Sequence, residues 1–479
     1  MTTTAEDRSG LRTFFIVWFG QLVSLVGTSL TAFGLSIWIF KETGSVTQLA
    51  AVLFAGLVPR LIVTPFAGAL VDRWDRRMAM LLSDLGAGIG TLMLVVFYFT
   101  GTLALWNIMI AVAVSGLFQA FQWPAYQAAM QVLVPKDQFS RASGLVQLAE
   151  AFGNMGGPIL AGVLIVATGI GGIFFVDVIT FLFAVGTLLV VRFPRPAESE
   201  AGAEGAGTLW HETKYGFVYL WNRHGLFALM IYFALLNLAF GFIGVLFIQL
   251  GLSVTGAAQL GTAFAVASVG MLVGSVIAST WSGFKHRVAG ILGLAVVLGL
   301  AMVLVGGRAS VVWITASVFV GMSVIPIATA ASQSIWLAKV EPDLQGRVAS
   351  VRATVAGSMI PISYLLVGPL ADNVFEPLMA EGGAMADGIG EIIGTGPGRG
   401  YALFFMVLGA FVIGISILAW FYSPLRNLET DIPDVEIDLE EEHEAELVAD
   451  EDIAASVAVT VHLDEDISTV PDPAPVVLE

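Results

Sequence analysis

Long uninterrupted apolar runs constrain the fold of this chain more than any other feature. A helix that crosses the ~30 Å hydrocarbon core of a bilayer needs roughly 20 predominantly apolar residues. The sequence is 57% hydrophobic and 12% charged, whereas soluble domains carry about 25% charged residues. We therefore expect an all-α integral membrane protein with twelve transmembrane helices, at residues 14–40, 46–71, 79–100, 105–132, 142–167, 171–192, 225–250, 257–280, 287–306, 310–337, 348–371 and 400–422.

The run that begins at Phe14 is too long for the core of a signal peptide, and no small-residue cleavage pattern follows it. We expect it to be the first spanning helix. The chain has no cysteine, which excludes disulfides and thiolate metal sites.

The basic residues fall on one side of the expected membrane. With the N-terminus inside, the outer segments hold only Lys41, Arg308 and Arg399, and Arg60 lies within a span. The other seventeen Lys and Arg fall on the inside, where basic residues accumulate. This distribution predicts a multi-pass protein with both termini in the cytoplasm, and we expect it in a bacterial plasma membrane.

An acidic segment closes the chain. Residues 427–479 hold eighteen Asp or Glu and no Lys or Arg, which accounts for the net charge of −17. Such a composition is typical of a disordered, solvated tail, and binding of a partner is the alternative.

The two halves of the chain resemble each other. The segment "VPKDQFSRASG" (134–144) follows the fourth run, and "VEPDLQGRVAS" (340–350) follows the tenth, so that Arg141 and Arg347 match. We expect two six-helix bundles arranged as a parallel repeat. The predicted organisation is an N-terminus (1–13), a first bundle (14–192), a cytoplasmic linker (193–224) that ends in an amphipathic stretch, a second bundle (225–423) and the tail (424–479).

This layout resembles the major facilitator superfamily. The segment "GALVDRWDRR" (68–77) is similar to the superfamily signature G-x-L-x-D-R-x-G-R-R, with Asp75 in place of a glycine. The resemblance implies that Gly68, Asp72, Arg73 and Arg77 form a conformational latch, and that the helix start at 345–348 receives it in one conformation. The N–H groups of a helix start favour a carboxylate. The alternative is a charge cluster that only fixes orientation.

A second motif resembles a pattern found on the fifth helix of family members that export drugs or metabolites against protons. The segment "GNMGGPILAG" (153–162) resembles the antiporter pattern G-x-x-x-G-P-x-x-G-G, carried by Gly153, Gly157, Pro158 and Gly162, with Ala161 in one glycine position. Small residues allow close helix packing, and that packing alone is the alternative. "GQLVSLVGTSL", "VPKDQFSRASG" and "GTGPGRG" also resemble the macrolide-efflux-type branch, which resembles drug:proton antiporters.

Four charges fall within the predicted spans, namely Arg60, Asp84, Glu150 and Asp177. Charges at such positions are costly and therefore functional candidates. From a rise of ~1.5 Å per residue, we expect Arg60 and Glu150 at one level with Gln21 and Gln122, facing a shared cavity. Arg60, Asp84 and Glu150 are the candidates for proton coupling.

The alternatives for these charges stay open. Protonation of Glu150 would release Arg60, and a static ion pair is the alternative. Glu150 shares a helix face with Gly153 and Gly157, where the halves are expected to meet. Asp84 lies about two turns from the inner interface and could reach water there, and we expect Asp177 to be structural.

The second half offers fewer polar groups. Asn237 and Gln333 are its substrate-cavity candidates, as Gln21 and Gln122 are in the first half. Phe240, Phe247 and Trp336 would line the same cavity or else face lipid. A mostly apolar cavity with a few polar points suits amphipathic or cationic substrates.

No nucleotide-binding or nucleophile motif is present, because "GTGPGRG" lacks the Lys and hydroxyl of a phosphate-binding loop. We expect no enzyme activity, no cofactor, no metal and no nucleic-acid partner. The predicted function is proton-coupled export of small hydrophobic or amphipathic molecules, such as a drug, a macrolide-like compound or a metabolite, by a monomer in the lipid bilayer. A lipid-handling or uptake transporter of the same fold is the alternative, and a non-transporting scaffold or sensor acting through the tail is another.

Overall fold

A computed structural model describes residues 5–73, 75–134, 138–191, 209–281, 283–341 and 344–434. It is built from helices, and twelve of those described are long and apolar enough to cross a membrane. This confirms the expected class and number of spans. Residues 1–432 form one compact unit, which is the part considered below.

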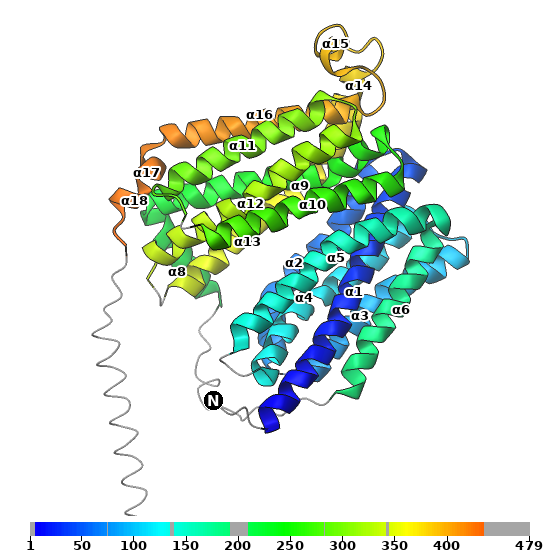
Figure 1. The fold of residues 1–479 in the computed structure, drawn as a ribbon, viewed down its shortest axis with the longest axis vertical. Helices are drawn as coiled ribbons and strands as arrows, with labels where there is room; N and C mark the ends of the chain where they lie inside the picture. Colours follow the sequence, from blue (N-terminus) through cyan, green and yellow to red (C-terminus); the bar gives the residue numbers. More distant parts are fainter. Residues whose placement is uncertain are drawn as a thin grey trace, which may run out of the picture. The chain divides into compact units, whose positions relative to one another are not determined.

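The first bundle follows the predicted runs closely. Figure 1 shows its helices in blue to green, side by side in one group. α1 begins before the apolar run, which leaves its first turns outside the span. The bundle contains α1 (Ala5–Thr43), α2 (Val46–Arg73), α3 (Arg76–Phe99), α4 (Leu105–Leu133), α5 (Phe139–Ala167) and α6 (Gly169–Val190).

The second bundle repeats this order after the linker. The spanning helices are α9 (His224–Val254), α10 (Ala257–Thr280), α11 (Arg287–Gly307), α12 (Val311–Lys339), α13 (Gln345–Leu370) and α16 (Arg399–Phe421). α1 begins and α16 ends on the side of the spans that we call the terminal end. We call the opposite side the far end.

Asp75 explains how the chain turns from α2 into α3. It is the N-cap of α3, and its carboxylate accepts a hydrogen bond from the backbone N–H of Met78 at 3.0 Å. Asp is among the preferred N-cap residues because its side chain satisfies a free N–H of the first turn. Asp75, which replaces the glycine of the superfamily signature, therefore stabilises the start of α3.

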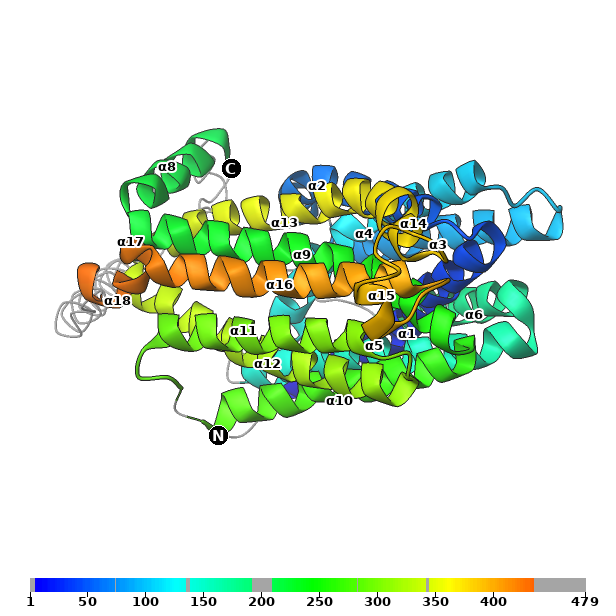
Figure 2. The same cartoon turned by 90° about the horizontal axis from the view of Figure 1, so that it is seen from above.

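The amphipathic stretch of the linker forms α8 (Leu209–Asn222). Figure 2 shows α8 apart from the spanning helices of the first bundle, near one end of α9 and α13. It packs on α13 closely enough that a Cβ on Gly216 would stand 3.0 Å from the carbonyl oxygen of Arg347.

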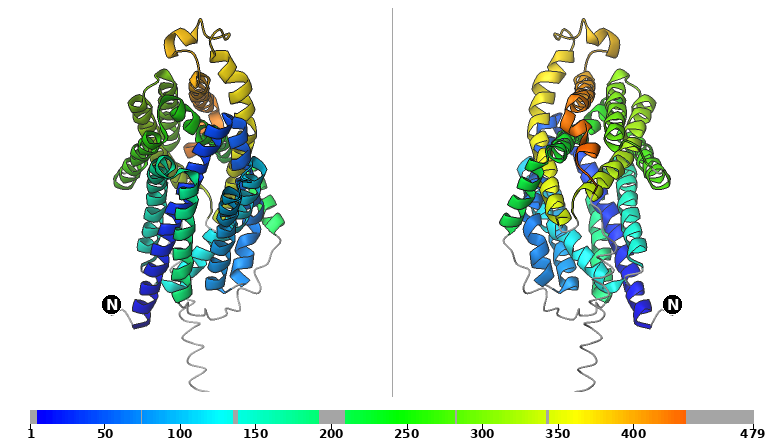
Figure 3. Two further views of the ribbon diagram at one scale, coloured as in Figure 1. Left: turned by 90° about the vertical axis from the view of Figure 1, so that its right-hand side faces the viewer. Right: turned by 90° about the vertical axis from the view of Figure 1, so that its left-hand side faces the viewer.

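At the far end, α13 continues into a helical segment that the sequence did not predict. It consists of η2 (Ala371–Phe375), α14 (Glu376–Met379) and α15 (Ile389–Ile393). Figure 3 shows this segment projecting beyond the ends of the spanning helices. The "GTGPGRG" segment leads from it into α16, with positive φ at Gly394, Gly396 and Gly398, a backbone conformation that favours glycine.

The bundles meet mainly through two helix pairs, α5 with α10 and α2 with α13, with smaller contacts of α1 and α2 with α9. The closest approaches lie toward the far end. A Cβ on Gly261 would stand 2.2 Å from the carbonyl oxygen of Pro158, and a Cβ on Gly368 would stand 2.3 Å from Cα of Thr47. Glycine allows these backbones to touch.

The folded unit extends further along the chain than we predicted. α17 (Ser423–Arg426) and α18 (Leu428–Asp431) follow α16, and Leu428 is fully buried. The carboxylate of Glu429 accepts the backbone N–H of Val288 at the start of α11 at 2.7 Å. The prediction that the tail begins at residue 424 is therefore wrong, since the compact unit ends at Ile432. Residues 435–479 lie outside the described residues.

Candidate functional site

Asp84 on α3 lies at the centre of a polar cluster inside the first bundle. The amide of Gln21 on α1 donates a hydrogen bond to its carboxylate at 2.7 Å, and the amide of Gln122 on α4 donates another at 3.3 Å. Gln122 also donates to the side-chain oxygen of Gln21 at 3.2 Å. The Asp84 side chain is 4% exposed, so the expectation that it reaches water at the membrane interface is wrong.

Arg60, Glu150, Gln21 and Gln122 surround one cavity of about 180 Å³. The structure thus places these four side chains as their depths along the helices indicate. Both side chains are among those that the structure describes, and no ion pair within 4.0 Å joins Arg60 to Glu150. In this conformation the expected Glu–Arg contact is not made, and both charged groups remain available to the cavity.

Asp177 on α6 lies on a neighbouring cavity of about 300 Å³, which Asp84 and Arg60 also line. Its carboxylate accepts hydrogen bonds from the hydroxyls of Thr31 on α1 at 2.9 Å and Thr91 on α3 at 3.0 Å. Asp177 therefore joins three helices of the bundle. These contacts agree with a structural role, which stays a prediction.

The second bundle contains a larger cavity of about 540 Å³ between α9, α11, α12 and α13. Asn237, Gln333, Phe240 and Trp336 line it, as the sequence predicted, together with many aliphatic side chains. The expectation for Phe247 is wrong, because its ring is buried in the core against Phe264 at 5.5 Å between centroids.

Sequence reasoning missed Arg352 on α13, which also lines this cavity. The residue was counted among the inside charges, although it lies within the predicted run 348–371. About two turns separate it from the start of α13, or about 10 Å at the usual rise. Its position inside the run was the signal that could have identified it.

The two parts of the antiporter-like motif on α5 pack against different helices, α1 and α10. A Cβ on Gly153 would stand 3.4 Å from Cβ of Leu25, and one on Gly157 would stand 2.4 Å from the hydroxyl of Ser29, so both glycines pack α5 on α1 of the same bundle. Only the later part of the motif reaches the other bundle, where a Cβ on Gly162 would stand 2.7 Å from the carbonyl oxygen of Ala257. The expected meeting of the halves at the Glu150 face is therefore wrong.

The predicted latch is described only in part. Gly68, Asp72 and Arg73 lie in the last turns of α2, and their side-chain surroundings are outside the described part of the chain. Arg77 donates hydrogen bonds to the carbonyl oxygens of Leu188 at 2.8 Å and Leu189 at 2.7 Å. In this conformation Arg77 contacts the end of α6 within its own bundle, where a cation is favourable.

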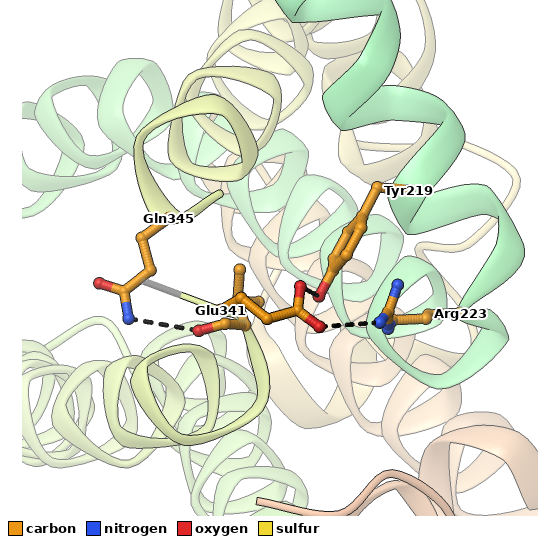
Figure 4. A network of polar contacts seen from close by, with 5 residues as sticks. Tyr219, Arg223, Glu341 and Gln345 are labelled. Carbon is orange, nitrogen blue, oxygen red and sulfur yellow. Dashed lines mark hydrogen bonds and ion pairs between the residues drawn. The ribbon is translucent and has the colours of Figure 1, made fainter. Parts of the chain in front are cut away.

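Residues of the linker contact the segment just before the predicted receiver of the latch. Figure 4 shows Tyr219 and Arg223 on two sides of the Glu341 carboxylate, which precedes α13. The Tyr219 hydroxyl donates to Glu341 at 2.9 Å, and Arg223 forms the ion pair at 3.2 Å. Burial raises the pKa of Tyr219 to about 12, and its hydrogen bond to Glu341 acts in the same direction.

Comparison with known families identifies the chain. The model of the Major Facilitator Superfamily matches residues 17–364, from the first helix of the first bundle into α13 of the second, and this range includes the residues that line the cavities. The chain belongs to the Major Facilitator Superfamily. It is therefore a secondary transporter and not an enzyme, and it acts on a small-molecule substrate in a membrane.

Two curated bacterial proteins are similar to this chain over most of its length. Macrolide efflux protein A of Streptococcus pyogenes is 25% identical over 368 residues, which cover 75% of this chain and 90% of the relative. The multidrug efflux pump Tap of Mycolicibacterium fortuitum is 26% identical over 370 residues, covering 74% and 88%. The relatives named here are bacterial.

Solved structures support the superfamily fold. A bacterial homolog of the human lysosomal transporter Spinster, solved in an inward-facing and unoccupied conformation, aligns with a TM-score of 0.65 and 13% identity. The alignment covers 89% of this chain and 99% of that structure.

Proposed function

We propose that this transporter exports small hydrophobic or amphipathic molecules from the cytoplasm in exchange for protons. The terminal end would face the cytoplasm, as the distribution of basic residues indicates. The cavities of the two bundles would form the substrate pathway between them, and a rocking motion of the bundles would expose it to each side in turn.

The environment of Asp84 carries this proposal. Its carboxylate is buried within a span, and the donors that hold it are two neutral amides. None of the described Lys or Arg side chains forms an ion pair with it. An ionised carboxylate without a cation is costly inside a membrane, so binding and release of a proton at this position would be linked to the conformations that change its surroundings.

Glu150 and Arg60 would connect this proton to the substrate pathway. Both line the cavity that also contains Gln21 and Gln122, the partners of Asp84. Protonation of Asp84 or Glu150 changes the charge that Arg60 faces. A change of net charge in a cavity of low dielectric has a large effect on the binding of a substrate. Two carboxylates could then take protons in succession as the bundles move.

The contacts between the bundles support an inward-open state. Toward the far end, Gly368 of α13 and Asp372 of η2 contact Thr47 at the start of α2. The α5–α10 contact lies on the same side of the membrane-spanning region, at Gly162 and Gly261. If the terminal end is cytoplasmic, these contacts close the outer side. The names of the two efflux relatives favour export over uptake.

Transport into inverted membrane vesicles tests the proposal. Vesicles with the full-length protein are given an acidic interior, and uptake of radiolabelled erythromycin, an amphipathic cation and an amphipathic acid is measured with and without a protonophore. We expect uptake of at least one compound that stops when the gradient is collapsed, with protons leaving the vesicle as the compound enters. Asp387→Asn, an exposed far-end residue, serves as the control variant.

The outcomes separate the alternatives. Uptake that continues unchanged without a proton gradient would contradict proton exchange. Movement of substrate out of the inverted vesicle, in the same direction as the protons, would indicate an uptake transporter. Absence of transport for the whole panel, with the protein inserted and folded, would contradict the substrate class.

A further inference from the structure

The 540 Å³ cavity of the second bundle has an unusual charge balance. Its described lining contains no Asp and no Glu, and Arg352 is its one charged residue. The cavities of the first bundle differ, because carboxylates of Asp84, Glu150 and Asp177 line them together with Arg60. The second cavity is therefore positively charged.

Neutral groups alone hold the Arg352 guanidinium. Its Nη2 donates a hydrogen bond to the side-chain oxygen of Gln333 at 3.3 Å, and its central carbon lies 4.0 Å from the centre of a Trp336 ring. Arg223 is held differently, by the carboxylate of Glu341. A guanidinium has five N–H donors, so the contact with Gln333 leaves most of them available to a ligand.

This arrangement fixes the guanidinium without neutralising it. The ring of Trp336 supports one face by a cation–π contact, and Gln333 limits rotation in the plane of the group. A guanidinium held in this way presents paired N–H donors that match a carboxylate or a phosphate. A cation without an anion is costly within a membrane span, and an anionic ligand group would remove that cost.

The rest of the cavity is suited to an apolar body. Phe233 and Phe240 on α9, Leu294 on α11 and Val324 on α12 line it. Cavities of this kind bind the apolar part of a ligand by burial, and a few polar groups fix its orientation. Asn237 and Gln333 supply the polar groups next to Arg352.

We propose that the cavity of the second bundle binds an amphipathic anion, whose charged group contacts Arg352 and whose apolar body lies between α9, α11 and α12. This rests on the proposed function in taking the cavity as part of the substrate pathway, but the binding itself requires no transport. It narrows the substrate class, because the sequence alone suggested amphipathic or cationic compounds.

Binding of a matched pair of probes tests the proposal. The full-length protein is placed in phosphatidylcholine nanodiscs without a proton gradient, and fluorescence titrations use 11-(dansylamino)undecanoic acid and its methyl ester. The wild type should bind the acid more tightly than the ester. Arg352→Gln should weaken binding of the acid about tenfold or more, as loss of a charge-assisted hydrogen-bond pair does, and leave binding of the ester within about twofold.

Two further variants control for folding and for charge. Arg308→Gln removes an exposed arginine that also lies near a tryptophan, 5.7 Å from the ring of Trp313, and should not change binding of either probe. Arg352→Lys keeps the charge but loses the paired donors, and binding of the acid should fall between wild type and Arg352→Gln. Equal melting temperatures establish that the variants are folded.

Replacing part of the phosphatidylcholine in the nanodiscs with phosphatidylglycerol identifies the source of the anion. If phosphatidylglycerol competes with the acid in wild type and not in Arg352→Gln, the anion is a lipid headgroup. If it does not compete, the anion is a soluble amphiphile. The proposal is overturned if folded Arg352→Gln binds the acid as well as wild type, or loses the acid and the ester equally. Failure of proton-driven export with the Arg352 effect retained would overturn only the proposed function.

Discussion

Asp372 of the second bundle accepts two hydrogen bonds from Thr47 of the first bundle, one from its backbone N–H at 2.9 Å and one from its hydroxyl at 2.8 Å. The same carboxylate accepts the backbone N–H of Val46 at 3.1 Å and the hydroxyl of Ser45 at 2.8 Å. Asp372 thus caps the start of α2 from the other bundle. This contact joins the two bundles at the far end.

The Asp372 contact has the chemistry that the resemblance to the superfamily signature implies for Asp72 at the other end. In both cases a carboxylate near the end of one helix faces the first N–H groups of its antiparallel neighbour, where the helix dipole favours an anion. α2 and α13 supply both helices. We expect the Asp72 contact with residues 345–348 to form when the Asp372 contact is broken.

Replacing Asp372 should open the far end. Asp372→Ala removes four hydrogen bonds across the bundles, and hydrogen bonds to charged groups contribute about 1.5–3 kcal/mol each in proteins. The chain has no cysteine, so spin labels on Thr102→Cys and Ala309→Cys report one distance between far-end loops. We expect a longer distance to become populated. An unchanged distribution, equal to that of the control Asp387→Ala, would contradict this role.

The close approach at Gly368 gives a steric test of the same contact. A Cβ on Gly368 would stand 2.3 Å from Cα of Thr47, whereas one on Gly357 of the same helix meets nothing within 4 Å. Gly368→Ala should destabilise the far-end-closed state by about 1–3 kcal/mol, as overpacking does. Gly357→Ala is the matched control, and the spin-label distance should change only in Gly368→Ala.

Substitutions of the buried carboxylates should separate coupling from structure. Asp84→Asn should abolish uptake driven by a proton gradient and retain exchange of labelled for unlabelled substrate, because the pathway stays intact without the titrating group. Asp177→Asn should lower the melting temperature and keep coupling, since Asp177 holds Thr31 and Thr91. If Asp84→Asn takes up substrate in a proton gradient as well as wild type, Asp84 is not the coupling site. Glu150→Gln would then test Glu150 in the same assay.

The Tyr219 contact predicts a pH dependence of stability. The folded pKa of about 12 lies above the ordinary value of about 10, so the contribution of the phenol is complete below pH 10. It decreases from pH 10 to 12, because the unfolded state loses this proton first. The stability difference between wild type and Tyr219→Phe, about 0.5–1.5 kcal/mol at pH 8, should shrink over this interval. Tyr215→Phe, on the exposed face of α8, should show no such change.

The position of a truncation decides whether the acidic tail matters for transport. Removal of residues 435–479 leaves the described unit intact, and we expect transport to be retained. Removal from residue 427 also deletes Leu428, which is fully buried, and the Glu429 cap on Val288. That variant should melt at a lower temperature. Loss of activity in the first truncation, with an unchanged melting temperature, would favour the scaffold or sensor alternative.

The sequence predicted the spans because the length and apolar character of a membrane helix follow from the bilayer itself. It could not predict which face of each helix meets a neighbour, since lipid-facing and protein-facing side chains are both apolar. Gly153 and Gly157 were therefore expected between the bundles, although they pack on α1. Phe247 was expected in the cavity for the same reason.

For the polar and charged residues, too, the sequence predicted some features of the site and not others. The depth of Arg60, Glu150, Gln21 and Gln122 along their helices was sufficient to place them around one cavity. Direct contacts were not predictable from depth, because Asp84 takes both glutamine amides while Arg60 and Glu150 form no ion pair. The cap by Asp372 depends on a pairing of residues more than 300 positions apart, which no local pattern indicates.

The backbone contact of Gly162 and Gly261 with the facing helix also limits how the substrate pathway can change. While this contact is kept, two rigid bundles can only turn about it, so displacement grows with distance from it, and opening of the far end requires the contact to part. Side chains close to the touching backbones would then move little, whereas Arg352, nearer the opposite side, would sweep a wide arc. A bound molecule held by that guanidinium would be carried with its helix, and the greatest change in its exposure would come at its charged group.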